Sequence, residues 1–399
     1  MSAATFALPS RGLRGGVHVD GVTLILMLSI VLLGLVMVTS ASISIASRDG
    51  GSPLLFLERQ FILTVTGLTL GALLFCIRPE MLERNSTVLL ALAAALLVMV
   101  LVPGLGHVVN GSRRWIRFAG FNFQASEAAR VLVLVYIASY AVRREAELRD
   151  TFVGLMKPLG VLMGFGLLLL LEPDFGAATV LVVTGFALLF LAGARVRWVL
   201  ALTVGLAAIG ALLVWAAPYR MKRLMTFLDP WADPFNSGFQ LTQSLIAIGR
   251  GEWFGVGLGA SVQKLFYLPE AHTDFLFAVL AEELGLVGVA VTLALFLALV
   301  WRVFHIARLA SDAGLKFQSY VAATFGLWLG IQAFINIGVN MGALPTKGLT
   351  LPLMSYGRSS AIVTLAWFGL VMRAYHDAVS QRRGSATAQR RRAAAEEDE

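Results

Sequence analysis

A polar, ionisable segment runs directly into a long apolar one in the stretch Leu268-Pro-Glu-Ala-His-Thr-Asp-Phe-Leu-Phe-Ala-Val-Leu-Ala-Glu-Glu-Leu-Gly285. From Phe275 onward the chain stays largely apolar as far as Trp301. This pattern predicts a helix that enters a membrane, with Asp274 at the junction. An ionisable residue at such a place is costly to keep there and indicates a functional site. The alternative is that Asp274 or its neighbour Thr273 only caps the N-terminus of the helix.

The composition of the whole chain excludes a soluble domain. Of its 399 residues 58% are hydrophobic and only 14% are charged, and the mean hydropathy is +0.78. Because ~20 apolar residues span the hydrocarbon of a membrane, we predict an all-α polytopic membrane protein with about ten transmembrane helices. The predicted spans begin near Val22, Phe61, Thr87, Ala128, Pro158, Phe175, Val196, Phe275, Phe317 and Leu351.

The distribution of Lys and Arg over the loops predicts the orientation, because cytoplasmic loops carry the excess of these residues. With ten spans both termini lie on the side that holds most of the basic residues, so we expect both in the cytoplasm. We divide the chain into a cytoplasmic tail (1–20), a transmembrane domain (21–378) and a disordered cytoplasmic tail (379–399). A large periplasmic loop, about 217–273, joins spans 7 and 8. The net charge of +8 then reflects this bias and attraction to anionic lipid, and we expect no binding to nucleic acid.

Polar residues gather in the segments predicted to face outward. Residues 115–118 and 121–124 are aromatic-rich and flank Ala119-Gly120, a pattern typical of a short β-hairpin. Arg113, Arg114 and Lys347 lie on the outer side against the charge bias. A guanidinium group matches phosphate oxygens as a bidentate fork, so these cations are candidates for binding a lipid phosphate. The alternative is that they anchor the protein at the interface beside an aromatic belt.

Further candidate residues near the same surface are three acidic residues and one arginine. Glu127 and Arg130 are three residues apart and share one helix face, which also fits an internal ion pair. Glu172 and Asp174 flank a proline that breaks the helix, where Asp174 is also suited to capping the next helix.

The outer loops themselves are not simply polar. In the long loop, 219–228 and 239–248 are predicted to be short amphipathic helices, the first of which lies in the membrane interface. The loop 341–360 contains Pro345 and Pro352, which predict an irregular backbone. Such a backbone at membrane depth is tolerated where it lines a cavity. The sequence therefore predicts a cationic, carboxylate-bearing cavity near the outer leaflet.

Several runs resemble the SEDS family of bacterial cell-wall proteins (shape, elongation, division, sporulation), and more the division branch of that family than the elongation branch. These runs are Asn110-Gly-Ser-Arg-Arg-Trp-Ile116, Gln124-Ala-Ser-Glu127, Glu172-Pro-Asp-Phe-Gly176, Ala271-His-Thr-Asp-Phe275, Glu282-Glu-Leu-Gly285 and Leu344-Pro-Thr-Lys-Gly-Leu-Thr-Leu-Pro-Leu-Met-Ser-Tyr-Gly357. Two positions depart from the family pattern. Ala125 stands where proline is usual, and Arg358 stands where a glycine is usual.

The resemblance implies a peptidoglycan glycosyltransferase of the bacterial inner membrane, active at the division septum. It would polymerise lipid II, the undecaprenyl-pyrophosphate-linked disaccharide pentapeptide, into β-1,4 glycan and release undecaprenyl pyrophosphate. Asp274 is then the expected base, Glu127, Arg130, Glu172, Asp174 and His272 are expected to support the cavity, and Arg113, Arg114 and Lys347 are expected to bind pyrophosphate. The expected partners are a class B penicillin-binding protein (the division transpeptidase), other divisome membrane proteins and membrane lipids. A divalent cation, Mg²⁺ or Mn²⁺, remains an open question, and a lipid II flippase or a non-catalytic divisome scaffold remain the alternative functions.

Overall fold

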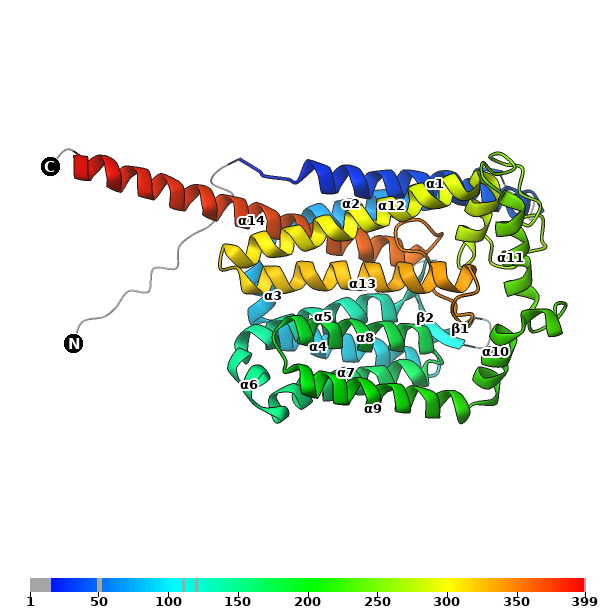
Figure 1. Cartoon of the computed structure of the whole chain (residues 1–399), viewed down its shortest axis with the longest axis horizontal. Helices are drawn as coiled ribbons and strands as arrows, with labels where there is room; N and C mark the ends of the chain where they lie inside the picture. The colour runs from blue at the N-terminus through cyan, green and yellow to red at the C-terminus, as the bar shows by residue number, and fades with distance from the viewer. Residues whose placement is uncertain (1–15, 49–51, 110–111, 119–120, 398–399) are drawn as a thin grey trace.

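Helices dominate the computed structural model, which describes residues 16–48, 52–109, 112–118 and 121–397 (Figure 1). Within these residues ten long helices form the body of the molecule. They are α1 (Gly21–Arg48), α2 (Leu55–Cys76), α4 (Ser86–Leu101), α5 (Ala125–Arg143), α7 (Phe152–Leu171), α8 (Phe175–Leu191), α9 (Val196–Trp215), α12 (Leu276–Asp312), α13 (Lys316–Asn340) and α14 (Arg358–Glu397). Seven of them are long and apolar enough to cross a membrane, and α4 and α8 are shorter apolar helices. The predicted polytopic all-α fold is confirmed.

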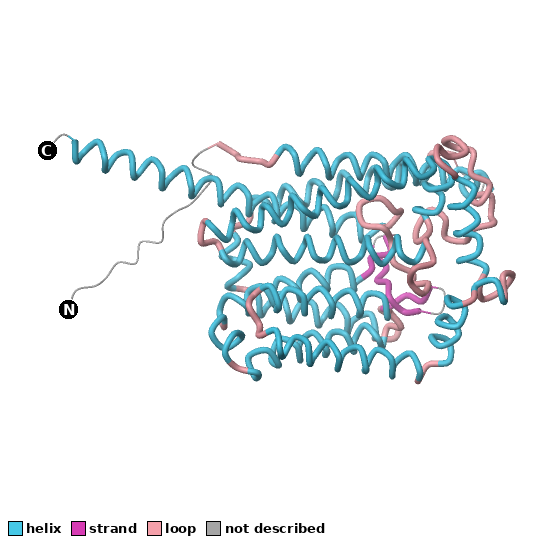
Figure 2. The backbone as a smooth tube through the Cα atoms, viewed as in Figure 1, coloured by secondary structure: helices cyan, strands magenta, loops and turns pink. Residues whose placement is uncertain are grey.

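The two ends of the bundle differ in character. Helix α1 begins and α14 ends at one end, whereas the strands and the longest loops gather at the opposite end, which we call the loop end (Figures 1 and 2). The short elements at the loop end are α10 (Pro218–Leu228), a 3-10 helix (Pro230–Ala232) and α11 (Phe239–Gly251), all in the connection between α9 and α12. The amphipathic helices expected there are present. The short helices α3 (Pro79–Arg84) and α6 (Glu145–Asp150) lie at the other end (Figure 1).

The predicted hairpin is present and has a third strand. Strand β2 (Ser112–Phe118) pairs antiparallel with β3 (Phe121–Gln124), with Trp115 opposite Gln124. Strand β1 (Gly106–Val109) pairs with the other edge of β2. Helix α5 begins immediately after β3, so the hairpin fixes where this helix starts. The N-cap residue is Gln124, and its side chain gives α5 no capping hydrogen bond.

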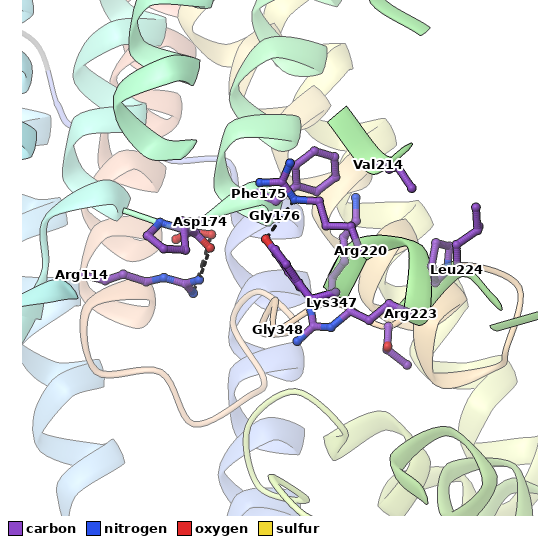
Figure 3. A pocket seen from close by; sticks show the side chains of 14 residues that line it. Arg114, Asp174, Phe175, Gly176, Val214, Arg220, Arg223, Leu224, Lys347 and Gly348 are labelled. Atoms are coloured by element: carbon purple, nitrogen blue, oxygen red, sulfur yellow. Dashed lines mark hydrogen bonds and ion pairs between the residues drawn. The ribbon is translucent and has the colours of Figure 1, made fainter. Parts of the chain in front are cut away.

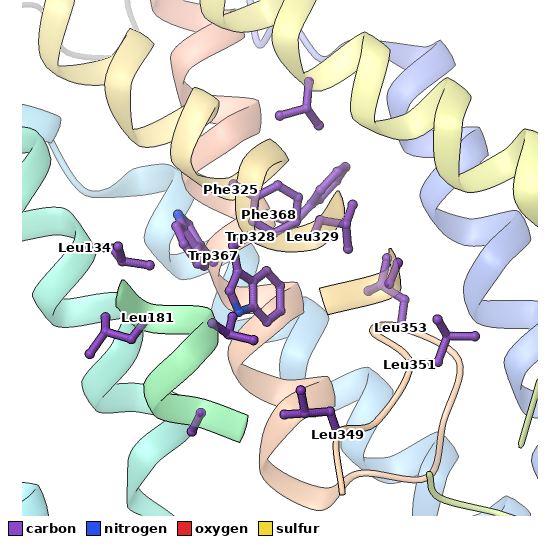
Figure 4. Close-up of a cluster of buried hydrophobic side chains, with 14 of the residues drawn as sticks. Leu134, Leu181, Phe325, Trp328, Leu329, Leu349, Leu351, Leu353, Trp367 and Phe368 are labelled. Carbon is purple, nitrogen blue, oxygen red and sulfur yellow. The ribbon is translucent and has the colours of Figure 1, made fainter. Parts of the chain in front are cut away.

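The hydrophobic core contains a cluster of aromatic rings surrounded by leucines (Figure 4). The ring centroids of Trp328 on α13 and Trp367 on α14 lie 5.5 Å apart, and Phe325 packs edge-on against Trp367 at 5.4 Å. Leu349 and Leu351, from the loop between α13 and α14, are buried in the same cluster. The loop is therefore packed into the bundle.

The last span begins later than expected. The sequence placed it near Leu351, but α14 starts at Arg358. The apolar residues before Arg358 are buried as irregular backbone, whose carbonyl groups find partners on α13. Gln332 Nε2 donates to the carbonyl of Thr350 at 3.1 Å, and Asn336 Nδ2 donates to that of Leu349 at 2.6 Å.

The tail from residue 379 also differs from the predicted disordered segment, because the structure continues α14 as a helix to Glu397. The residues of this segment include several Ala, Arg, Gln and Glu, which have high intrinsic helix propensity. Residues 1–15 of the predicted N-terminal tail lie outside the described residues.

The long connection is attached to a break in α12. Gly285 has the non-helical angles φ 62° and ψ −164°, and the amide of the following Leu286 donates to the carbonyl of Glu252 at 2.9 Å. Two residues before Gly285, the buried Glu283 accepts from the ammonium group of Lys264 at 2.8 Å. A buried ion pair with hydrogen-bonded partners holds its two elements in one register. The segment that leads to Asp274 is thereby fixed against α12.

Candidate active site

A cavity of about 500 Å³ opens at the loop end and collects side chains from distant parts of the chain. Its lining includes the predicted residues Arg114, Glu127, Arg130, Asp174, His272 and Asp274, and it also includes Arg223, Glu270, Tyr356 and Arg358. Strand β2, helices α5, α8 and α10, and the loops that precede α12 and α14 all contribute. Most of the predicted site is therefore brought together by the fold.

Asp274 lies on the wall of this cavity, two residues before α12 begins. Its carbonyl oxygen accepts hydrogen bonds from the side-chain amides of Asn336 at 2.8 Å and Asn340 at 3.0 Å. Phe275 occupies the N-cap position, and the side-chain carbonyl of Asn340 accepts the amide of Ala278 at 3.1 Å. Another helix therefore supplies the cap. In the described part of the chain the Asp274 carboxylate has no hydrogen-bond or ion-pair partner, so the capping alternative finds no support.

The surroundings of Asp274 favour a carboxyl group that gains and loses a proton near neutral pH. Burial raises the pKa of Asp274 to about 7, and the negative charge of Glu270 adds to the increase. The positive charges of Arg114 and Arg223 act in the opposite direction. A general base is most effective when its pKa lies near the working pH.

Arg114 holds the turn between α7 and α8. Its Nε donates to the carbonyl oxygen of Glu172 at 3.2 Å, another of its nitrogens donates to that of Pro173, and a third lies 3.9 Å from Oδ1 of Asp174. Asp174 also caps α8, accepting the amide of Ala177 at 3.0 Å, as the sequence suggested. The arginine is thereby fixed with its charge at the cavity.

Glu172 is the exception among the predicted cavity acids. Its side chain is fully buried, both carboxyl oxygens lack a partner within the described residues, and it is not part of the cavity lining. Burial, and then the neighbouring Asp174, raise the pKa of Glu172 to about 8. A pKa of about 8 favours the neutral carboxylic acid at pH 7.

Glu127 and Arg130 form the expected ion pair on one face of α5. Both side chains are buried, and an Arg130 nitrogen also lies 3.4 Å from the side-chain oxygen of Gln332 on α13. The pair lines the cavity and joins the two helices there. His272 contributes a ring that packs against Phe56 and Tyr356, with centroids 5.1 and 5.6 Å away.

A second cavity of about 200 Å³ adjoins the first (Figure 3). Arg114, Asp174, Arg223 and Gly348 line both. Lys347 lines the smaller one, where its ammonium group lies 4.7 Å from the ring centroid of Phe175. Burial lowers the pKa of Lys347.

Three charged residues of these cavities, Arg220, Arg223 and Glu270, were not among the predicted site residues, and Arg358 was noted only as a departure from the family pattern. The first two belong to α10, whose basic residues suggested an interfacial helix. Their spacing of three residues, which places both on one face, was the available signal.

Arg113 does not join the site. Its guanidinium donates to the carbonyl of Leu101 at 3.2 Å, and it lines neither cavity. Among the described residues no group of three or more His, Cys, Asp or Glu side chains could hold a metal ion.

Fold and site together define a multi-pass membrane protein with a cationic cavity at one end and an unpaired carboxylate in its wall. Residues 21–379 match the family profile FTSW_RODA_SPOVE, described as cell cycle protein. The chain belongs to this family, which is the SEDS family of the sequence analysis.

Curated relatives and solved structures agree with this membership. The chain is 58% identical over 348 residues to "Probable peptidoglycan glycosyltransferase FtsW" of Thioalkalivibrio sulfidiphilus, covering 87% of each chain. It is 54% identical to the protein of the same name from Nitrosococcus halophilus, over 86% of this chain and 88% of the relative. A chain from the structure "Structural coordination of polymerization and crosslinking by a peptidoglycan synthase complex" superposes with a TM-score of 0.74 at 33% identity, covering 90% of this chain and 98% of that one. The rod shape determining protein RodA of Thermus thermophilus gives a TM-score of 0.66 at 30% identity, over 91% and 98%.

Proposed function

We propose that this protein is a peptidoglycan glycosyltransferase that polymerises lipid II into β-1,4 glycan strands during septal wall synthesis, with Asp274 as the general base. Support for the enzyme class comes from relatives above 50% identity that carry this name. Support for the base comes from the site, where the Asp274 carboxylate lies unpaired in a cavity large enough for sugar units.

The cavity supplies the two things that inverting glycosyl transfer needs. A base must take the proton of the acceptor hydroxyl as its oxygen attacks the sugar carbon. Positive charge must stabilise the pyrophosphate that leaves. Asp274 performs the first task. Arg114, held by the 172–174 turn, Arg223 and Lys347 supply the second. Glu127 and Arg130 hold α5 against α13 so that the cavity keeps its shape.

The protein acts in the bacterial inner membrane with both termini in the cytoplasm and the loop end in the periplasm. A class B penicillin-binding protein is the proposed partner, and the similarity to a chain of a peptidoglycan synthase complex supports it. The rival function, a lipid II flippase, would need a polar path open to each leaflet in turn. The strands, α10 and the loop before α14, which contribute residues to the two cavities, lie instead at the loop end (Figure 1).

The test uses the purified full-length protein with its transpeptidase partner and lipid II in detergent micelles, scored for glycan polymer on gels. We expect polymer from the wild type and none from Asp274→Asn. Micelles have no second leaflet, so polymer formed there is not the product of translocation. If the wild-type pair repeatedly gave no polymer while a known polymerase did so in the same micelles, the proposal would be wrong.

A further inference from the structure

The smaller cavity carries more positive charge than its own acids neutralise. Arg220, Arg223 and Lys347 line it, and none of the three forms an ion pair with a described residue. Its one carboxylate, Asp174, is already close to Arg114 and caps α8. Three unpaired cations around a cavity are the usual setting of a polyanion.

The cations also converge on each other. The guanidinium carbon of Arg220 and the ammonium nitrogen of Lys347 lie 5.0 Å and 4.7 Å from the ring centroid of Phe175. Both charges are therefore within about 10 Å of one another, no more than a Debye length at ~0.1 M salt. An anion bound beside both cations would offset their mutual repulsion. Figure 3 shows both side chains beside the ring of Phe175.

The position of this cavity relative to the base is the second observation. Lys347 and Gly348 are adjacent in the chain, and Gly348 lines both cavities. A Cβ atom placed on Gly348 would lie 3.0 Å from Oδ2 of Asp274. The smaller cavity thus begins directly beside the Asp274 carboxylate, separated from it by a residue without a side chain.

The third observation is the apolar surface beside the cavity. Val214 and Leu224, from the end of α9 and from α10, line its other side. Trp215, Met225 and Leu228 on the same two helices are more than half exposed. An amphipathic helix of this kind lies in the membrane interface, so a polyprenyl chain can pass from the cavity into lipid.

We infer that the smaller cavity is the leaving-group subsite, which binds the pyrophosphate of the donor, and that the larger cavity receives the acceptor sugar. The inference rests on the proposed function. The donor is the substrate whose pyrophosphate is attached to the reacting carbon, so its phosphates must lie within one sugar of the base. The acceptor's own pyrophosphate is a disaccharide away from its reacting hydroxyl and has no such constraint.

The assignment gives a balanced step. The acceptor hydroxyl in the larger cavity loses its proton to Asp274, and its oxygen forms the new bond to C1 of the donor sugar. The C1–oxygen bond to the pyrophosphate breaks, and the electron pair leaves with the phosphate oxygen. Arg220, Arg223 and Lys347 stabilise that charge together with Arg114, which lines both cavities. The product in the smaller cavity is polyprenyl pyrophosphate.

The experiment measures binding of undecaprenyl pyrophosphate to the full-length protein in nanodiscs of neutral lipid. Undecaprenyl monophosphate and phosphatidylglycerol are the other probes, because they offer the same phosphate chemistry from different sources. Arg220→Ala and Lys347→Ala are each expected to weaken pyrophosphate binding ten- to hundredfold, the equivalent of ~1.5–3 kcal/mol. Lys347→Arg should retain most of the binding and serves as the folding control. Lys222→Ala is the matched control, since Lys222 is an exposed cation of α10 that lines neither cavity.

Asp274→Asn should bind undecaprenyl pyrophosphate at least as tightly as the wild type does, because it leaves the lining of the smaller cavity intact and removes a negative charge beside it. Wild-type affinity in both Arg220→Ala and Lys347→Ala would overturn the inference. Equal binding of phosphatidylglycerol, lost in the same variants, would overturn it too and make the cavity a general lipid anchor. Polymer formation by the same wild-type preparation distinguishes failure of the proposed function from failure of the subsite assignment. If it polymerises lipid II while the variants bind normally, only the subsite assignment fails.

Discussion

The side-chain amide of Asn340 donates a hydrogen bond of 3.0 Å to the carbonyl oxygen of Asp274, at the point where α13 meets the start of α12. Asn336 donates to the same oxygen at 2.8 Å. Two neutral amides therefore position the backbone of Asp274, and its carboxylate is left free to react. The carbonyl oxygen of Asp274 fixes the position of the residue, and its carboxylate is available for reaction. A substitution of the asparagines tests the first, and a substitution of Asp274 tests the second.

Asp274→Asn should reduce lipid II polymerisation by about 100- to 10,000-fold, the usual contribution of a general base. The amide keeps the size of the side chain but cannot accept the proton. The backbone bonds to Asn336 and Asn340 do not involve the side chain, so thermal stability in detergent should be unchanged. Near-normal polymerisation by this variant, which caps a helix as well as aspartate does, would show that Asp274 is not the base.

The rate of polymerisation should rise with pH through about 7. Burial and Glu270 raise the pKa of Asp274 to about 7, and only the deprotonated form accepts a proton, so activity is lost as the pH falls below this value. The loss should approach tenfold per pH unit. Glu270→Gln removes a negative charge that raises the pKa of Asp274, and should shift the rising limb to lower pH. The measurement is kcat between pH 5.5 and 8.5 for both proteins. An unshifted limb in Glu270→Gln would contradict the assignment of that limb to Asp274.

The spans were predictable because crossing hydrocarbon leaves a local signature of length and composition. The start of α14 was not. The apolar run around Leu351 satisfies the same signature, but amides on α13 bond its carbonyls and the run is buried without being helical. A contact between residues far apart in the sequence decided this boundary, and no local pattern reports such a contact.

The site residues also divide into those that local sequence predicts and those that depend on distant contacts. Asp274 was predictable since a single carboxylate at the start of a long apolar run is conspicuous. Arg220 and Arg223 were identified only as residues of an interfacial helix, because nothing in the sequence shows that Arg220 lies over the ring of Phe175 at the start of α8. Arg113 was expected beside Arg114, yet neighbours on a β-strand point to opposite faces, and only Arg114 reaches the cavity.

Glu172→Gln should change how stability depends on pH. Burial raises the pKa of Glu172 from about 4.5 to about 8, so the folded protein holds a proton that the unfolded chain releases above about 4.5. Stability contributed by this group is fully present at lower pH and is lost progressively as the pH rises towards 8. The Gln variant stays neutral throughout, so its melting temperature relative to the wild type should increase from pH 5 to pH 8. A constant difference would show that Glu172 is ionised in the folded state.

The loop end should face the periplasm. Ser237 lies in an exposed part of the connection between α9 and α12, and Ser237→Cys in a Cys76→Ala background places the only thiol there. We expect labelling by a membrane-impermeant maleimide in intact spheroplasts, at a rate similar to that after lysis. A cysteine placed in the α6–α7 connection, Thr151→Cys, should react only after lysis. The reverse pattern would overturn the proposed orientation.

Breaking the buried pair of Glu127 and Arg130 tests whether these residues hold the cavity or take part in the chemistry. Glu127→Gln leaves the Arg130 charge buried without its carboxylate, which should destabilise the protein by about 3–5 kcal/mol and lower its melting temperature in detergent. Replacing both residues, Glu127→Gln with Arg130→Met, removes the uncompensated charge and should restore much of the stability. If the pair only positions α5 against α13, the double variant should also regain polymerisation at high lipid II concentration. Restored stability without polymerisation would instead assign the pair a role in the reaction itself.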